Sequence, residues 1–219
     1  MKARVDAIIQ REQAEYLERI HPAGDALISE MEAYAAERRV PIADREVALF
    51  LEITARATGA RRALEIGTAI GYSVIHLLRG MPDDGTVTTI EPNDEMIRRA
   101  GDYFERAGVS SRVRVERGLA LDVLPRLEGG FDLVYLDAVK EEYSDYLRLS
   151  LPLLRRGGVV ICDNLLWGGQ VAGVPRSPDQ STSTEALRRF NREFVAHPKL
   201  RAEILSVGDG LGYGVKITD

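Results

Sequence analysis

The chain has 219 residues and a formal charge of −5, with 29 Lys and Arg against 34 Asp and Glu. This acidic balance argues against a nucleic-acid partner, and the lack of any apolar run of about 18 residues argues against a membrane span. The single cysteine, Cys162, excludes an intramolecular disulfide and a cysteine-rich zinc site, so any metal must be held by oxygen ligands.

The first sixty residues are predicted to be helical, with breaks at residues 21–24 and 39–41 and an end at Gly59. Charges at Lys2 and Arg4 do not fit a signal peptide, and we expect a cytoplasmic protein. After Gly59, short β-branched runs alternate with helical stretches. Strands are predicted at residues 62–66, 86–90, 113–115, 132–136, 158–162, 202–207 and 211–218, and helices at 72–78, 94–107, 143–154 and 183–196.

This alternation predicts βαβ units and an α/β fold whose mostly parallel sheet is covered by helices on both faces. The short turn at residues 208–210 can join only antiparallel strands, so we expect one antiparallel strand at the end of the sheet. Residues 165–182 are rich in Gly, Pro and Ser and are expected to form a lid loop. We divide the chain into an N-terminal helical extension, residues 1–40, and one domain, residues 41–219.

The first strand-to-helix junction carries two glycines, Gly67 and Gly71, and Glu91 ends the second strand 20 residues later. Glycines let the backbone approach a ligand, and an acidic residue in that place can accept hydrogen bonds from ribose hydroxyls. NAD and S-adenosylmethionine both fit, and so does a tight turn without a ligand. Ala69 replaces the glycine that would face a pyrophosphate, and the carboxylate of Glu65 suits a cationic cofactor better.

Oxygen ligands follow two later strands: Asp137 ends the fourth, and Asp163 and Asn164 end the fifth. Carboxyl ends of parallel strands lie at one edge, and two carboxylates with an amide suit Mg²⁺ or Mn²⁺. A helix cap at Asp137 and a local turn at Asp163 are the structural alternatives. Lys140 lies on the loop after Asp137, where a nearby cation would disfavour its charged form and let it act as a base. Otherwise it is a solvated surface lysine.

Three segments together resemble the cofactor and metal motifs of class I S-adenosylmethionine-dependent O-methyltransferases. They are residues 65–73, 136–143 and 163–169, with weaker matches at 118–120, 124–125 and 208–211. The resemblance covers residues 40–218 and points to the cation-dependent branch, which includes catechol and caffeoyl-CoA O-methyltransferases. It implies a Rossmann-like sheet of seven strands, mostly parallel with the last strand antiparallel, and a homodimer.

By this resemblance the chain transfers a methyl group from S-adenosylmethionine to a hydroxyl of a catechol-type small molecule. The residues expected to bind the cofactor are Glu65, Gly67, Thr68, Gly71, Tyr72, Ser73, Glu91, Ala120 and Asp137. Asp137, Asp163 and Asn164 are expected to bind the metal, most naturally Mg²⁺, with Mn²⁺ or Ca²⁺ as alternatives. Lys140 is expected to deprotonate the acceptor, with Asp137 linking the metal to the cofactor.

Three positions depart from the family pattern. Val139 stands where the family often has an Asp that contacts the cofactor, and Leu119 stands where a polar residue is common. Gly212 replaces a glutamate that contacts the substrate in the mammalian catechol enzyme. Two other functions stay open: an NAD-dependent oxidoreductase, and a catalytically silent protein that binds S-adenosylmethionine.

Overall fold

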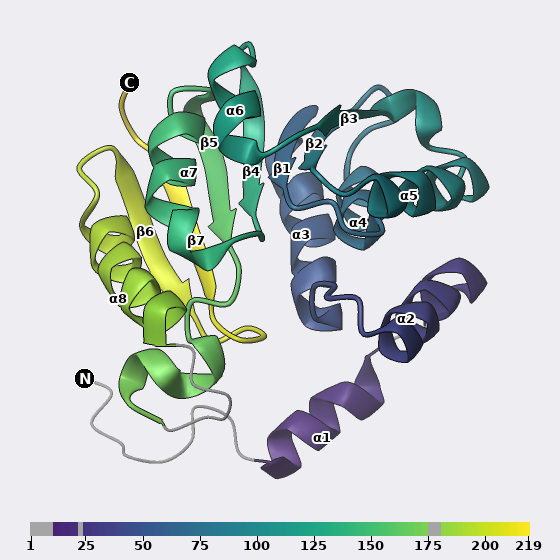
Figure 1. Ribbon diagram of the computed structural model, residues 1–219, viewed down its shortest axis with the longest axis horizontal. Helices are drawn as coiled ribbons and strands as arrows, with labels where there is room; N and C mark the ends of the chain where they lie inside the picture. Colours follow the sequence, from purple (N-terminus) through teal and green to yellow (C-terminus); the bar gives the residue numbers. More distant parts are fainter. Residues whose placement is uncertain (1–10, 22–23, 175–180) are drawn as a thin grey trace.

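The computed structural model describes residues 11–21, 24–174 and 181–219 (Figure 1). Its strands form one sheet in the order β3-β2-β1-β4-β5-β7-β6. The strands are β1 Arg62–Ile66, β2 Thr86–Glu91, β3 Val113–Arg117, β4 Phe131–Leu136, β5 Leu154–Cys162, β6 Leu200–Leu205 and β7 Leu211–Lys216. The predicted seven-stranded, mostly parallel Rossmann-like sheet is confirmed.

The helices are α1 Arg11–Ile20, α2 Ala26–Arg38, α3 Arg45–Thr58, α4 Tyr72–Gly80, α5 Asp94–Arg106, α6 Ala120–Val123, α7 Tyr143–Ser150 and α8 Ser181–Ala196. Short 3₁₀ turns are η1 Ser110–Arg112, η2 Leu124–Arg126, η3 Lys140–Glu142 and η4 Trp167–Ala172. The helix expected over 143–154 is shorter than predicted, because Pro152 follows it and β5 begins at Leu154. Within the expected lid, η4 spans residues 167–172 but is kinked, because Gly168 and Gly169 have positive φ angles, and residues 175–180 lie outside the described residues.

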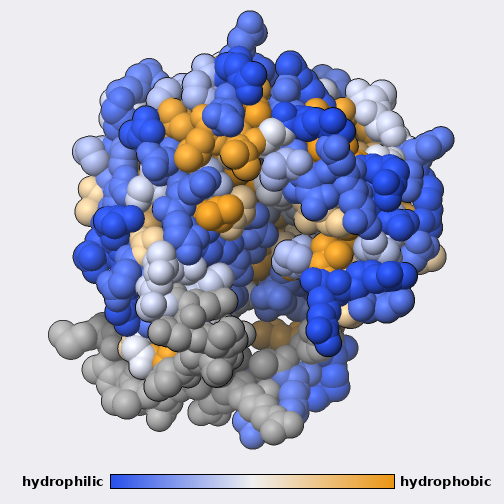
Figure 2. Space-filling view, in the orientation of Figure 1, coloured by the Kyte–Doolittle hydropathy of each residue, from blue (hydrophilic) through white to orange (hydrophobic). Residues whose placement is uncertain are grey.

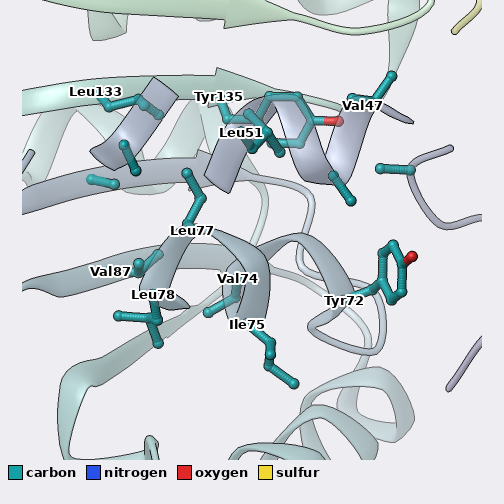
Figure 3. Close-up of a cluster of buried hydrophobic side chains, with 14 of the residues drawn as sticks. Val47, Leu51, Tyr72, Val74, Ile75, Leu77, Leu78, Val87, Leu133 and Tyr135 are labelled. Atoms are coloured by element: carbon teal, nitrogen blue, oxygen red, sulfur yellow. The ribbon is translucent and has the colours of Figure 1, made fainter. Parts of the chain in front are cut away.

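Successive residues of the central strands face two separate cores, as expected for a sheet covered on both sides. Leu133 and Tyr135 of β4 belong to a core that also contains residues of α2, α3, α4 and α5, and Figure 3 shows them with Val47 and Leu51 of α3 and with side chains of α4. Val134 and Leu136 belong to the other core, with residues of α6, α7 and α8. Ile28, Met31 and Ala35 of α2 belong to the first core, so this helix is packed onto the domain. The division of the chain at residue 40 stays a prediction.

The antiparallel strand is β7, the last in the chain, but its expected place at the end of the sheet is wrong. β7 lies between β5 and β6 and pairs antiparallel with both. Its residues are mostly buried, whereas β6 carries the exposed Arg201 and Glu203. Charged side chains are tolerated on an edge strand and disfavour it in the interior, which explains why β6 takes the edge.

The surface seen in Figure 2 is mostly hydrophilic, and its hydrophobic residues form small separate groups. Within the described ranges, every helix is too short or too polar to cross a membrane. The topology reverses direction between β1 and β4, which places a crevice beyond the carboxyl ends of these two strands.

Candidate functional site

A cavity of about 730 Å³ lies at the carboxyl ends of the parallel strands. This volume is in the range of sites for small molecules and cofactors. Nine of the residues singled out in the sequence line it: Gly67, Thr68, Tyr72, Ser73, Glu91, Ala120, Asp137, Lys140 and Asn164. Three others, Glu65, Gly71 and Asp163, do not line it. The cavity therefore brings together residues from five strand ends.

The glycine turn after β1 is shaped by two close approaches. Gly67 has φ +105°, and a Cβ atom there would lie 2.1 Å from the carbonyl oxygen of Asp137. Gly71 has φ +84°, and a Cβ atom there would lie 2.4 Å from the ring of Phe104. Gly67 thus lets the ends of β1 and β4 approach each other, and Gly71 makes room for α5.

Glu91 is fixed by two backbone amides. Its Oε2 accepts a hydrogen bond from the N–H of Ala69 at 2.9 Å, and its Oε1 accepts one from the N–H of Asn93 at 3.0 Å. The side chain is buried and lines the cavity. Each oxygen keeps a further lone pair for a ligand hydroxyl.

Glu65 lies behind the residues that line the cavity. It is fully buried and accepts hydrogen bonds from the hydroxyls of Ser73 and Thr89, the latter at 2.6 Å. Burial raises the pKa of Glu65 to about 7, while these two hydrogen bonds lower it. Thr89 was not predicted from the sequence, although it faces the same side of β2 as Glu91 two residues later.

Tyr72 connects the cavity to α2. Its hydroxyl donates to Oε1 of Glu32 at 2.8 Å, and Arg45 Nε donates to the same oxygen at 3.1 Å. In Figure 3 the Tyr72 hydroxyl is directed away from the hydrophobic cluster. Burial, followed by the hydrogen bond with Glu32, raises the pKa of Tyr72. Glu32 was not singled out in the sequence, because its partner lies 40 residues away.

The oxygen ligands expected from the sequence lie on two hydrogen-bonded strand ends. The Asp163 N–H donates to the carbonyl of Leu136 at 3.0 Å, which places it next to Asp137. Asp163 accepts from the Tyr135 hydroxyl at 2.8 Å and from the N–H of Asn164 at 2.7 Å. Asn164 has φ +60°, a conformation that Asn tolerates better than most residues.

The carboxylates of Asp137 and Asp163 lie at the adjacent ends of β4 and β5, and the charge of one affects the pKa of the other. Burial, and next the charge of Asp137, raise the pKa of Asp163 to about 7. Among the described residues, no three His, Cys, Asp or Glu side chains are grouped to hold a metal ion. Two carboxylates and the Asn164 amide are therefore the donors at hand. They fit a hard divalent cation, which would relieve the repulsion.

Lys140 is held by two side chains. Its Nζ donates to Oδ1 of Asp137 at 2.9 Å and to the hydroxyl of Tyr143 at 2.7 Å. The Tyr143 hydroxyl in turn lies 3.2 Å from the carbonyl oxygens of Leu136 and Asp163. Lys140 is 9% exposed, so it is not a solvated surface lysine. Tyr143 was missed in the sequence, where its only signal is a position three residues after Lys140.

Two departures from the family pattern lie in the cavity wall, and the third does not. Leu119 and Val139 line the cavity with exposures of 61% and 51%. Gly212 pairs with Cys162 on β5, and a Cβ atom there would lie 2.6 Å from Leu165. A glutamate could not be placed at Gly212 without moving that side chain.

A family model described as O-methyltransferase matches residues 25–217. The chain is 43% identical over 154 residues to a catechol O-methyltransferase of Mycobacterium tuberculosis, covering 70% of this chain and 68% of the relative. It is 31% identical over 183 residues to a caffeoyl-CoA O-methyltransferase of Citrus natsudaidai, with 77% of each covered. The structure is similar to that of an O-methyltransferase from Bacillus cereus in complex with SAH. The TM-score is 0.82 and the identity 31%, with 92% of this chain and 96% of that chain covered.

Proposed function

The chain belongs to the O-methyltransferase family, and on this premise we propose that it methylates a catechol-type small molecule with the help of a divalent metal ion. Family membership confirms the resemblance in the sequence motifs. It also decides between the two candidate cofactors. Solved relatives are in complex with SAH or SAM, which supports S-adenosylmethionine and leaves the NAD-dependent alternative without support.

The acceptor class is inferred from the relatives. Two catechol O-methyltransferases, at 43% and 33% identity, and several caffeoyl-CoA O-methyltransferases match this chain. Catechol and caffeoyl groups both carry two neighbouring hydroxyls on an aromatic ring. Two adjacent oxygens can chelate one cation, which fits the donor set at the ends of β4 and β5.

The observation that supports the metal best is the pairing of Asp137 and Asp163 on adjacent strand ends, with Asn164 beside them. These three residues would hold the ion, most naturally Mg²⁺, with Mn²⁺ or Ca²⁺ as alternatives. When bound, such a cation would lower the pKa of a coordinated hydroxyl and orient it toward the methyl group.

Lys140 is the proposed base. After it has lost a proton, its Nζ would take the proton of the acceptor hydroxyl while the methyl carbon leaves sulfur and bonds to oxygen. Its contacts with Asp137 and Tyr143 keep the amine at the end of the cavity where the metal donors lie. A general base positioned in this way contributes about 10²–10⁴-fold to the rate.

The cofactor would occupy the part of the cavity lined by the turn after β1 and by the ends of β2 and β3. Glu91 would accept hydrogen bonds from the ribose hydroxyls, and Ala120 would lie against the adenine ring. Gly67, Thr68, Tyr72, Ser73 and Asp137 would surround the amino-acid end. Glu65 and Gly71 would support this wall without touching the ligand, because neither lines the cavity.

A methyl-transfer assay tests the proposal. Purified protein is incubated with labelled S-adenosylmethionine and either catechol, a caffeoyl ester or a matched monohydroxy compound, with Mg²⁺ or with EDTA. We expect transfer only to the vicinal diols and only with metal. Activity that survives EDTA would contradict the metal, and equal activity on monohydroxy compounds would contradict the acceptor class. SAH binding without any turnover would favour a silent binder.

The organisation of the chain is also a proposal. We infer a helical extension at residues 1–40 preceding the methyltransferase domain at 41–219, assembly as a homodimer, and a cytoplasmic location. Sedimentation equilibrium tests the homodimer directly, and a single species at 24.3 kDa would contradict it.

A further inference from the structure

Glu142 is a carboxylate of the cavity lining that the proposed function does not yet use. It belongs to η3 and lines the cavity together with Tyr146 of α7. The Tyr146 hydroxyl donates to Oε2 of Glu142 at 2.6 Å, and Tyr146 itself is buried. Among the described residues, no group donates to the other carboxylate oxygen, Oε1. The side chain is therefore held at one oxygen and can accept a hydrogen bond from a ligand at the other.

This carboxylate lies on the same side of the sheet as the proposed adenine end of the cavity. α6 begins at Ala120 and packs against α7 (Figure 1), and Ala120 and Tyr146 belong to the same core. Glu142 immediately precedes α7, and its N–H donates to the carbonyl of Val139 at 3.1 Å. Val139 lines the cavity as well. Glu142 and Ala120 therefore border one flank of the cavity.

The rest of this flank offers a ligand few polar side chains. Leu119 and Val139 both line the cavity, and each stands where a polar residue is common in the family. Tyr146 gives its only proton to Glu142, and Lys140 is bound to side chains at the proposed metal end. In the part of the chain that the structure describes, Glu142 is thus the side chain of this flank with an acceptor oxygen left for a ligand.

We propose that Glu142 recognises the adenine of the cofactor: its Oε1 accepts a hydrogen bond from the exocyclic amino group, and Tyr146 holds the carboxylate in place. This inference rests on the proposed function, which places S-adenosylmethionine in the cavity with its adenine ring near Ala120. The amino group of adenine donates hydrogen bonds, and a carboxylate only accepts them. The two groups are therefore complementary.

An SAH analogue without the amino group tests this directly. In 6-deamino-SAH a hydrogen replaces the amino group, while the ribose and the amino-acid end are the same. Calorimetry in EDTA measures both ligands on the wild type, Glu142→Ala and Tyr146→Phe. We expect the wild type to prefer SAH about tenfold, as for one hydrogen bond to a charged group, and Glu142→Ala to lose this preference by weakening SAH alone. Tyr146→Phe should reduce the preference, because the carboxylate is no longer held.

Glu141→Ala is the matched control. Glu141 is exposed on the same turn as Glu142 and does not line the cavity. The control removes the same charge from the neighbouring position, and we expect it to keep the full preference for SAH. A loss of preference in Glu141→Ala as large as in Glu142→Ala would mean that charge alone, and not a hydrogen bond, is measured, and would overturn the inference.

Three further results would overturn it: a wild type that binds both ligands equally, a Glu142→Ala variant that binds both more weakly by the same factor, or one with unchanged SAH binding. A merely structural role of Glu142 gives the second result. A role in binding the acceptor gives the third, with a raised KM for a catechol. Failure of the proposed function is recognised separately, because the wild type would then bind neither SAH nor its analogue.

Discussion

At each end of the cavity, a buried carboxyl group with a pKa raised to about 7 lies behind the lining residues. The two groups, Glu65 and Asp163, differ in what surrounds them. At the cofactor end, Glu65 accepts hydrogen bonds from Ser73 and Thr89, which lower the pKa against the effect of burial. At the proposed metal end, the charge of Asp137 is the largest effect after burial and raises the pKa of Asp163 further, while the Tyr135 hydroxyl lowers it. The charges of Asp137 and Glu91 also raise the pKa of Glu65, but less than its two hydroxyl partners lower it. The largest effect after burial therefore stabilises the carboxylate of Glu65 and destabilises that of Asp163.

This difference indicates how each end is completed. The cofactor end already has its hydrogen bonds, including two from backbone amides to Glu91, so it is preorganised without a metal. The metal end keeps two like charges together, an arrangement that a cation would stabilise. We therefore expect cofactor binding to be independent of metal and catalysis to depend on it.

The largest expected effect comes from removing a metal donor. Asp163→Ala should lower kcat/KM for a catechol by about 10³-fold, because a bound cation contributes several kcal/mol and each 1.36 kcal/mol is tenfold. The SAH dissociation constant should stay within about twofold of the wild type. Steady-state kinetics and calorimetry measure the two quantities. Asp145→Asn, at an exposed position on α7, is the control and should be neutral. Parallel loss of SAH binding would show that the two ends are not independent.

The next effect separates the charge of Lys140 from its ability to accept a proton. Lys140→Arg keeps a cation beside Asp137, but an arginine is not deprotonated in proteins. We expect kcat to fall by about 10²-fold or more, the usual contribution of a general base, with SAH affinity unchanged. Lys199→Arg, at an exposed position just before β6, serves as the matched control. A Lys140→Arg enzyme with near-normal kcat would remove Lys140 from the role of base.

The sequence predicts that Asp137, Asp163 and Asn164 lie close together, because these residues follow strands directly. Asp137, Asp163 and Asn164 each come just after a run of buried residues, and the carboxyl ends of parallel strands must meet at one edge. Their neighbourhood therefore follows from the alternation of strands and helices, without side-chain detail. Glu91 and Gly67 are predicted for the same reason.

The supporting residues could not be predicted, because they depend on register and side-chain direction. Thr89 reaches Glu65 only because those two residues are register partners on β2 and β1. Glu32 reaches Tyr72 from a separate helix, α2. The interior place of β7 was also missed, since a tight turn fixes that two strands are antiparallel but not which of them takes the edge.

A smaller effect is expected at the cofactor end from Glu91→Gln. The amide of glutamine has one acceptor oxygen, so either Ala69 or Asn93 loses its partner and the ribose loses a charged acceptor. We expect SAH to bind about 10-fold more weakly and KM for S-adenosylmethionine to rise, with kcat at saturation little changed. Glu95→Gln, exposed at the start of α5, is the control. A fall in kcat without a change in SAH affinity would contradict the assignment of Glu91 to cofactor binding.

The smallest effect is a pH dependence of stability in the metal-free protein. The pKa of Asp163 is about 7 in the folded chain against an ordinary value of 3.8, so the folded state binds a proton that the unfolded state lacks between these values. Its contribution to stability is fully present below about pH 4 and is lost as the pH rises through 7. Asp163→Asn removes this dependence, so its Tm relative to the wild type should rise from pH 5 to pH 8 in EDTA.

The comparison of the two proteins isolates this carboxyl group. Two other buried groups also make stability depend on pH. Burial lowers the pKa of His76, which acts in the opposite direction, and the pKa of Glu65 is raised to about 7, like that of Asp163. Both groups are present in the wild type and in Asp163→Asn, so their effects cancel in the difference in Tm. Each kcal/mol corresponds to about 2–4 °C in a chain of this size, so scanning calorimetry can resolve the difference. Adding Mg²⁺ at pH 8 should raise the Tm of the wild type and leave that of Asp163→Asn nearly unchanged. A difference in Tm that does not vary with pH would mean that neither burial nor the charge of Asp137 raises the pKa of Asp163 in the folded chain.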